Sequence, residues 1–291
     1  MRNLTEQNIT EVVINSFANT QNPRLKEILT SLVKHLHAFV REVELTEEEW
    51  LYGIQFLTRT GHMCDDKRQE FILLSDTLGV TTLKDIINNR KPPGVTEYTI
   101  LGPFYVEDAP ELPAMANIAG ATPGEPVVIS GRVTDPSSHP LADALLDVWQ
   151  ASAEGFYDVQ LPDQSELNLR GKFRTDAEGR YAFRTIKPSF YPIPGDGPVG
   201  QMLRTVGRHP YRPAHIHFIV SASGYETVTT ELFVEGDPYL DSDAVFGVRN
   251  SLVVDFVRSE SAEEAARYGV TDPFYTVEYN FILQPAPSSG S

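Results

Sequence analysis

The chain has 291 residues, with 40 acidic against 24 basic side chains and a formal net charge of -16 at pH 7. This balance argues against nucleic acid as a partner, because phosphate binding needs a basic surface that releases counterions, and against docking on anionic lipid. The single cysteine, Cys64, excludes an internal disulfide framework and a cysteine-based metal cluster. With 41% hydrophobic residues, the composition is that of an ordinary globular protein with a buried core.

Membrane and secretion signals are not evident in the sequence. No apolar run approaches the roughly 20 residues that cross a bilayer, so membrane insertion is not expected. The opening run MRNLTEQNIT lacks the basic start, apolar centre and small-residue cleavage site of a secretory signal. We therefore expect a cytoplasmic protein.

The first ninety or so residues contain helix start signals followed by apolar residues at helical spacing. Asn22 and Pro23 supply an N-cap and a first-turn proline, and Thr46 and Glu49 form a capping-box pattern. Gly79 is a residue at which a helix can end. From these signals we predict helices over residues 23–43, from 46 past 57, over 67–78 and over 82–89.

The texture changes at residues 90–94, after which prolines, glycines and short β-rich runs dominate. Many short strands with turn residues between them are typical of an antiparallel sandwich or barrel. We therefore expect an α+β protein, with a helical N-terminal domain over residues 1–95 and an antiparallel β-sandwich over 96–291. The predicted strands are residues 127–133, 144–151, 180–186, 215–222, 227–234, 252–257 and 275–283.

The sharpest local signal is the run RPAHIHF at residues 212–218. Residues i and i+2 of a strand point to the same face, so His215 and His217 can reach one metal ion, while Ile216 and Phe218 face the core. By itself this pattern is weak, because strand histidines are often simply packed and hydrogen-bonded. Metal binding and core packing both remain open on these residues alone.

Two tyrosines stand in unusual settings and could complete a metal site. Tyr157 follows the end of an apolar strand, and Tyr191 lies in a loop rich in proline and glycine. No aspartate or glutamate stands at close spacing to the histidines, as a two-histidine-one-carboxylate iron(II) site requires. Phenolate is a hard anionic ligand that suits a trivalent ion, but a phenol with a pKa of about 10 ionises near neutrality only beside a strong cation. For either tyrosine alone, packing is the simpler explanation.

The combined spacing Tyr157–x33–Tyr191–x23–His215–x–His217 resembles the ligand set of the intradiol ring-cleavage dioxygenases. Other runs that resemble this family are LGPFY at 101–105, DVWQ at 147–150, TDAEGRY at 175–181 and GRHP at 207–210. The resemblance extends over most of the chain, including the helical start typical of the catechol and hydroxyquinol 1,2-dioxygenase branch. A single metal site then accounts for all four residues, so a separate packing role for each is no longer needed.

The resemblance implies one iron(III) per chain, with Tyr157 and His215 as equatorial ligands and Tyr191 and His217 as axial ligands. The substrate would be a dihydroxy- or trihydroxybenzene that O2 cleaves between two hydroxylated carbons. On binding, the diol would displace Tyr191, which leaves as a phenol with one substrate proton.

Two further residues are judged from the same resemblance. Arg212 would place positive charge beside the bound substrate, although a surface position is the usual fate of an arginine. Glu231 stands where catechol-type relatives often carry glutamine. A carboxylate near the metal would repel a dianionic substrate or need a proton, so we expect Glu231 to point elsewhere.

The acidic run from Asp237 to Asp243 lacks the glycine and the terminal glutamate of a calcium loop, so we expect a solvated turn there.

The family's pocket positions give a hypothesis about the substrate. Asp76 could accept a hydrogen bond from a third ring hydroxyl, which favours hydroxyquinol, giving maleylacetate, over catechol or chlorocatechol, giving cis,cis-muconates. A solvated helix residue is the alternative for Asp76. The residues that the resemblance assigns to the substrate pocket are Leu73, Asp76, Ile100, Gly102, Pro103, Phe104, Ile193, Pro194 and Arg212.

The helical start resembles the segment through which catechol-branch enzymes dimerise, often around a bound phospholipid. We therefore expect residues 1–95 to form the dimerisation domain of a homodimer, with a phospholipid at its interface, and residues 96–291 to be the catalytic iron domain. One rival is a non-catalytic β-sandwich binding module, since this fold hosts many functions. A second rival is an extradiol or cupin-type iron(II) oxygenase, which needs a carboxylate ligand.

Overall fold

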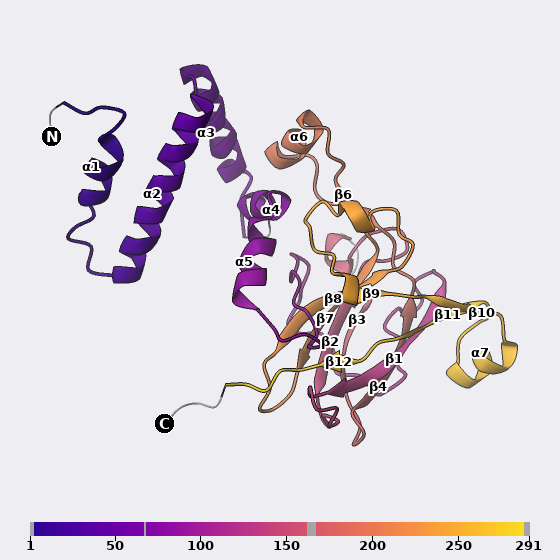
Figure 1. The fold of residues 1–291 in the computed structure, drawn as a ribbon. Coiled ribbons are helices and arrows are strands. Elements are labelled where there is room, and N and C mark those ends of the chain that lie inside the picture. The colour runs from indigo at the N-terminus through magenta and orange to yellow at the C-terminus, as the bar shows by residue number, and fades with distance from the viewer. Residues whose placement is uncertain (1–2, 67, 162–166, 288–291) are drawn as a thin grey trace. The chain divides into compact units, whose positions relative to one another are not determined.

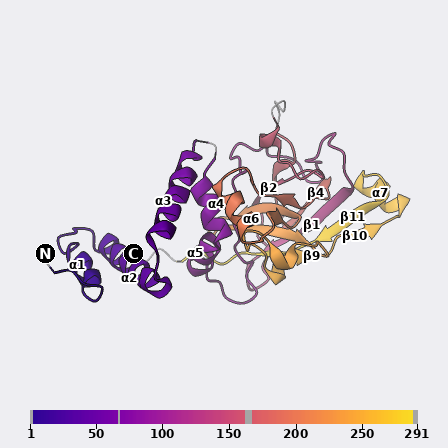
Figure 2. The same cartoon turned by 90° about the horizontal axis from the view of Figure 1, so that it is seen from above.

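The chain divides into two compact units, of which the first ends at His62 and the second begins at Met63. The computed structural model describes residues 3–66, 68–161 and 167–287, and Figures 1 and 2 draw it from two directions. The second unit therefore begins before the predicted boundary near residue 95, and it includes the short helices of residues 70–88 as well as all the described sheets.

Over residues 3–62, the first unit contains three helices, α1 (Ile9–Asn15), α2 (Pro23–Val43) and α3 (Glu47–His62). The predicted caps of the two longer helices are confirmed. Asn22 Oδ1 accepts a hydrogen bond from the Leu25 amide at 3.0 Å. Thr46 and Glu49 form the capping box, in which each backbone amide donates to the side chain of the other residue. The helix α1 is not among the predicted helices.

Among the described residues of the second unit there are four shorter helices: α4 (Glu70–Thr77), α5 (Val80–Asn88), α6 (Pro198–Thr205) and α7 (Ala262–Tyr268). Gly79, at φ +71°, makes the turn between α4 and α5. The helix predicted over 67–78 begins three residues late, and Lys67 lies outside the described residues. The α4 helix contacts α6, and the two lie side by side in Figure 2. Neither α6 nor α7 is predicted from the sequence.

Two five-stranded sheets form the body of this unit (Figure 1). One runs β10-β11-β1-β12, with β4 also paired to β1, and the other runs β3-β2-β7-β8-β9. A third, two-stranded sheet joins β5 to β6. The strand bounds are β1 (Pro126–Thr134), β2 (Leu145–Gln150), β3 (Arg170–Arg174), β4 (Arg180–Ile186), β5 (Tyr191–Pro192), β6 (Tyr211–Arg212), β7 (His215–Ser221), β8 (Val228–Val234), β9 (Val253–Val254), β10 (Val257–Ser259), β11 (Phe274–Glu278) and β12 (Phe281–Ile282).

The α+β class is confirmed, because the helical first unit is followed in the chain by a unit whose core lies between two large sheets. Alternate residues of β1, such as Val127 and Ile129, pack with alternate residues of β7, such as Phe218 and Val220, in one buried cluster. The sheets are mixed rather than purely antiparallel, since β1 pairs in parallel with β11 and β12, and β8 with β9.

Two predicted strands are broken in the structure. Residues 252–257 divide because the chain leaves β8 of one sheet after β9 and joins β11 of the other as β10. Residues 275–283 divide at Tyr279, whose carbonyl oxygen would lie 1.7 Å from a Cβ at Gly131. Only glycine on β1 allows the returning chain to approach so closely, and β11 and β12 pair with β1 on either side of this point.

Candidate metal centre

Four buried side chains converge at one end of β7: Tyr157, Tyr191, His215 and His217. Tyr157 Oη lies 3.1 Å from His217 Nε2 and 3.4 Å from His215 Nε2. The two Nε2 atoms are 3.1 Å apart, and the two phenol oxygens are 3.5 Å apart. Residues far apart in the sequence therefore offer two nitrogen and two oxygen donors to a single point.

The β7 strand positions both histidines by its alternation, as predicted. Ile216 and Phe218 enter the core between the sheets, so His215 and His217 face the other side. His215 Nδ1 lies 2.7 Å from the Pro213 carbonyl oxygen, which accepts its proton and leaves the Nε2 lone pair directed at the centre.

The two tyrosines come from separate segments that lie close together at Gly155 and Tyr191. Tyr157 precedes the 3-10 turn η1 (Asp158–Gln160), and its ring stacks on Phe104 at a centroid distance of 4.5 Å. Tyr191 lies on β5, paired with Arg212 of β6. A Cβ at Gly155, where φ is +83°, would lie 2.9 Å from Tyr191 Cβ. Glycine is required there by both conformation and space.

Arg212 is buried beside this cluster between two carboxylates, not exposed on the surface. Its Nη1 donates to Glu231 Oε1 at 2.8 Å, and its Nε donates to Asp243 Oδ1 at 3.1 Å. The same Nη1 lies 3.2 Å from His215 Nε2. The prediction of a solvated turn is wrong for Asp243, which is buried against this arginine. The sequence shows only several acidic residues in a turn, so it could not indicate that Asp243 is buried while the residues just before it are exposed.

Glu231 points into the site, so the expectation that it points elsewhere is wrong. The ladder between β7 and β8 sets Glu231 directly opposite His217. Its Oε1 lies 3.3 Å from His215 Nε2 and 3.5 Å from His217 Nδ1. The donor atoms of His215, His217 and Glu231 all lie within 4.8 Å of one another, so this cluster could hold a metal ion.

The protonation of the site suits a metal of high charge. Burial lowers the pKa of His215 to about 4 and that of His217 well below its usual value, so both imidazoles are neutral, as ligands must be. Burial raises the pKa of Tyr157 and of Tyr191, although Arg212 opposes the shift in both. Phenolates form here only beside a strong cation. Two neutral imidazoles and two phenols at one buried point therefore fit a trivalent ion.

The predicted pocket residues other than Arg212, which is buried as described above, divide into three groups. Leu73, Ile100 and Ile193 share one apolar cluster with Leu203, Ala244 and Val245. Gly102 and Phe104 instead contact the centre itself: a Cβ at Gly102 would lie 3.3 Å from His217 Cε1, and Phe104 stacks on Tyr157.

The remaining pocket residues are more exposed. Pro103 and Pro194 are exposed, and Asp76 is half-buried near the end of α4. Sequence reasoning missed Ala244 and Val245, because neither belongs to a periodic segment.

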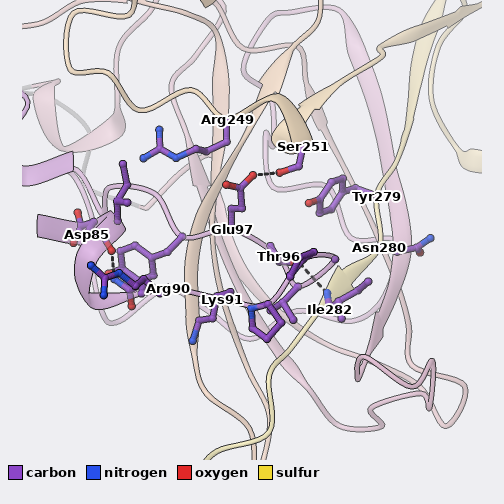
Figure 3. A pocket seen from close by; sticks show the side chains of 17 residues that line it. Asp85, Arg90, Lys91, Thr96, Glu97, Arg249, Ser251, Tyr279, Asn280 and Ile282 are labelled. Atoms are coloured by element: carbon purple, nitrogen blue, oxygen red, sulfur yellow. Dashed lines mark hydrogen bonds between the residues drawn. The ribbon is translucent and has the colours of Figure 1, made fainter. Parts of the chain in front are cut away.

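A separate cavity of about 530 Å³ lies between the end of α5, the segment 91–98 and β12 (Figure 3). Its lining includes none of the four convergent residues. Most of its charged groups are already engaged, since Lys91 pairs with Glu226 and Glu97 accepts from Ser251. Arg249 donates to three backbone carbonyls. We assign no chemistry to this cavity.

Comparison with known proteins identifies the family. Residues 100–285 match the model of the Dioxygenase family, and residues 22–96 match that of the catechol dioxygenase N terminus. The chain is 52% identical over 280 residues to the hydroxyquinol 1,2-dioxygenase of Rhizobium sp. (strain MTP-10005), covering 96% of this chain and 95% of that protein. The chain belongs to the intradiol ring-cleavage dioxygenases.

Other relatives place this intradiol dioxygenase in the catechol and hydroxyquinol 1,2-dioxygenase branch. It is 51% identical to the 6-chlorohydroxyquinol 1,2-dioxygenase of Cupriavidus pinatubonensis, covering 98% of this chain and 99% of that protein. The solved structure of hydroxyquinol 1,2-dioxygenase from Pseudomonas putida DLL-E4 matches with a TM-score of 0.92 and 48% identity, over 97% of this chain and 99% of that chain.

The chain is therefore an enzyme, and membership of this family excludes both the binding module and the extradiol or cupin-type oxygenase. Across the described ranges, every helix is too short or too polar to span a membrane.

Proposed function

We propose that this dioxygenase cleaves hydroxyquinol between its two adjacent hydroxylated carbons, giving a hydroxy-muconate that tautomerises to maleylacetate. One iron(III) per chain would be held by Tyr157, Tyr191, His215 and His217. The observation that carries the proposal is the convergence of two phenol oxygens and two imidazole nitrogens on one buried point. When bound there, iron(III) would draw electron density from the diol ring and open it to attack by dioxygen.

Tyr191 is proposed as the base that takes a substrate proton. Its backbone is held by the two-residue ladder of β5 with β6, whereas the ring of Tyr157 is stacked on Phe104. Of the two tyrosines that would hold the metal, Tyr191 could therefore move with less disturbance of the core and accept the proton at its Oη. Burial raises the pKa of the Tyr191 phenol, and the neighbouring charge of Arg212 opposes that shift by favouring the phenolate, which is the form that accepts the proton.

Arg212 is proposed to stabilise the electron-rich ring of the bound substrate. Its guanidinium lies 3.2 Å from His215 and is held from two sides by Glu231 and Asp243. A donor fixed in a dry site before the reaction needs no reorganisation when charge develops. Substrate positioning is thus assigned to Arg212 and to the apolar cluster that contains Leu73 and Ile193.

The position of Asp76 supports the proposal that hydroxyquinol is the preferred substrate over catechol and chlorocatechol. Its carboxyl is half-buried on α4, the helix that also carries Leu73 of the apolar cluster. A carboxylate that accepts from a third ring hydroxyl makes a charge-assisted contact of about 1.5–3 kcal/mol. Catechol would leave the same carboxylate desolvated without a partner. A related catechol 1,2-dioxygenase of Candida albicans is 42% identical to this chain, so catechol remains the second candidate.

Assembly is proposed to be homodimeric through residues 1–95. The helices of the first unit expose large apolar side chains to solvent. A stripe of this kind on one chain is best covered by another copy, with a phospholipid tail as a further apolar filling. The exposed residues are Leu25, Ile28, Leu32, Leu36, Phe39 and Val43 on α2, and Trp50, Ile54 and Leu57 on α3.

The proposed function is tested with purified, iron-loaded protein. Oxygen uptake and product are followed with hydroxyquinol, catechol and a chlorocatechol, and iron is counted per chain. We expect about one iron per chain, a wine-red colour from tyrosinate ligation and fastest cleavage of hydroxyquinol. A colourless, iron-loaded and fully active enzyme would refute the tyrosine ligands, and a preference for catechol would refute the substrate.

A further inference from the structure

Glu231 is a fully buried carboxylate whose role the proposed chemistry leaves open. One of its oxygens, Oε1, faces Arg212 Nη1 at 2.8 Å, His215 Nε2 at 3.3 Å and His217 Nδ1 at 3.5 Å. Its other oxygen, Oε2, finds no hydrogen-bond partner in the described part of the chain. A buried ionised group in this setting is costly unless its neighbours carry compensating charge or protons.

The first neighbour is the guanidinium of Arg212. Asp243 binds it from the opposite side and also accepts from the backbone amides of Val245 and Gly247, so this loop and the guanidinium form one unit. A Cβ at Gly247 would lie 2.8 Å from Arg212 Nη2 and 3.2 Å from Glu231 Oε2. The backbone therefore closes over the ion pair. Without Glu231, the Nη1 edge of a buried cation would lose its partner.

The second neighbour is the imidazole of His217. Its Nε2 faces Tyr157 and His215, whereas its Nδ1 is buried without a hydrogen bond to any described residue. When Nε2 binds a metal ion, Nδ1 carries the proton and needs an acceptor. The carboxylate of Glu231, opposite on β8, is placed to accept it after a small contraction from 3.5 Å.

The same geometry argues against Glu231 as a metal ligand. An imidazole binds one metal ion through one nitrogen, and Nε2 of His217 lies 3.1 Å from both Tyr157 Oη and His215 Nε2. Glu231 lies on the Nδ1 side of that ring. Its Oε1 is 3.3 Å from His215 Nε2, but this oxygen already accepts from Arg212 Nη1, which lies 3.2 Å from the same nitrogen.

We propose that Glu231 is a positioning residue. Its carboxylate holds both the His217 imidazole that faces the metal and the Arg212 guanidinium that faces the substrate. This inference rests on the proposed metal centre with two tyrosines and two histidines. It adds a carboxylate that stabilises the centre without touching the ion. Acceptors placed behind a ligating histidine typically change metal affinity or activity about 10- to 100-fold when they are removed.

The test compares Glu231→Gln and Glu231→Leu with Glu235→Gln, which removes the same charge from an exposed neighbour on the chain. Three quantities are measured: the visible tyrosinate band of the iron-loaded protein, the rate of iron transfer to a chelator, and the Tm of the metal-free protein. We expect Glu231→Gln to keep the band at a shifted maximum and to lose iron about tenfold faster, with Glu231→Leu losing it faster still. The Glu235→Gln variant should match the unmodified protein.

Three results would overturn the proposal. If both Glu231 variants match the unmodified protein in band and iron transfer, the carboxylate positions nothing. If only the Tm falls, its role is structural. If Glu231→Gln abolishes iron binding while Tyr157→Phe and Tyr191→Phe retain it, Glu231 is a ligand. Failure of the proposed function is recognised separately, because the unmodified iron-loaded protein would then lack the tyrosinate band or ring cleavage.

Discussion

Trp149 and His217 lie face to face on neighbouring strands, with ring centroids 4.7 Å apart and ring planes 1° from parallel. Gly102 lies against the Cε1 edge of the same imidazole. The ring of His217 is therefore held on one face and one edge. Trp149 Nε1 makes no hydrogen bond to the described residues, so the indole acts through packing alone.

Substitution of Trp149 tests this stacking. Trp149→Ala should destabilise the metal-free protein by about 3–5 kcal/mol, because a large buried ring leaves a cavity. Iron should also be lost more readily, since the His217 ring can then rotate. Trp149→Phe keeps an aromatic face and loses no hydrogen bond, so its effects should be smaller. Urea unfolding and iron content measure the two effects, and equal losses in both variants would contradict the stacking argument.

The roles of the two tyrosines are separated by Tyr191→Phe and Tyr157→Phe. Tyr191→Phe should retain part of its iron but slow substrate deprotonation, because the departing base is missing. Tyr157→Phe should disturb the resting visible band while Tyr191 still leaves on substrate binding. Spectra recorded during anaerobic addition of substrate distinguish the two. If substrate displaces Tyr157 instead, the assignments are reversed.

Local patterns predicted the parts of the structure that depend on neighbouring residues. The Asn22 cap and the Thr46–Glu49 box follow from a few adjacent side chains. The two faces of β7 follow from the alternating direction of side chains along a strand, which places His215 and His217 on one side and Phe218 in the core. The helical start and the strand-rich remainder were predicted for the same reason.

Long-range pairing determined what the sequence could not predict. The ladder of β5 with β6, which brings Tyr191 beside Arg212, is two residues long and has no periodicity to detect. Glu231 enters the site because of the register between β7 and β8, and a one-residue slip would have turned it away. Asp243 reaches Arg212 from an irregular turn. Such contacts depend on how the completed sheets pack.

Asp76→Ala tests the basis of substrate choice. The unmodified enzyme should prefer hydroxyquinol to catechol by about ten- to hundredfold in kcat/KM, which corresponds to the contact energy expected for a dry carboxylate. The variant should lose hydroxyquinol activity while sparing or raising catechol activity, since the unpaired carboxylate is gone. Steady-state kinetics on both substrates measure the ratio. An unchanged ratio of the two kcat/KM values in the variant would show that Asp76 does not determine the substrate preference.

The same carboxyl predicts a pH dependence of substrate preference. Burial raises the pKa of Asp76 above its usual value, although Thr81 and Arg212 oppose the shift. Only the ionised form makes the charge-assisted contact, and a raised pKa means that Asp76 takes up its proton before ordinary carboxyls do as the pH falls. The ratio of kcat/KM for hydroxyquinol to that for catechol should therefore fall towards acid pH. In Asp76→Asn the ratio should not change with pH over the same range.

The last prediction concerns assembly through the exposed face of α2. Leu32 lies in the middle of this apolar stripe and is about half exposed. Leu32→Asp should place a charge where the partner packs, and a buried unpaired carboxylate costs several kcal/mol. Ser31→Asp adds the same charge at an adjacent exposed residue outside the apolar stripe and serves as the control. Sedimentation at micromolar concentration should show a dimer for the unmodified protein and the control, and a monomer for Leu32→Asp. A monomeric unmodified protein would contradict the homodimer, and a dimeric Leu32→Asp variant would move the interface away from this face.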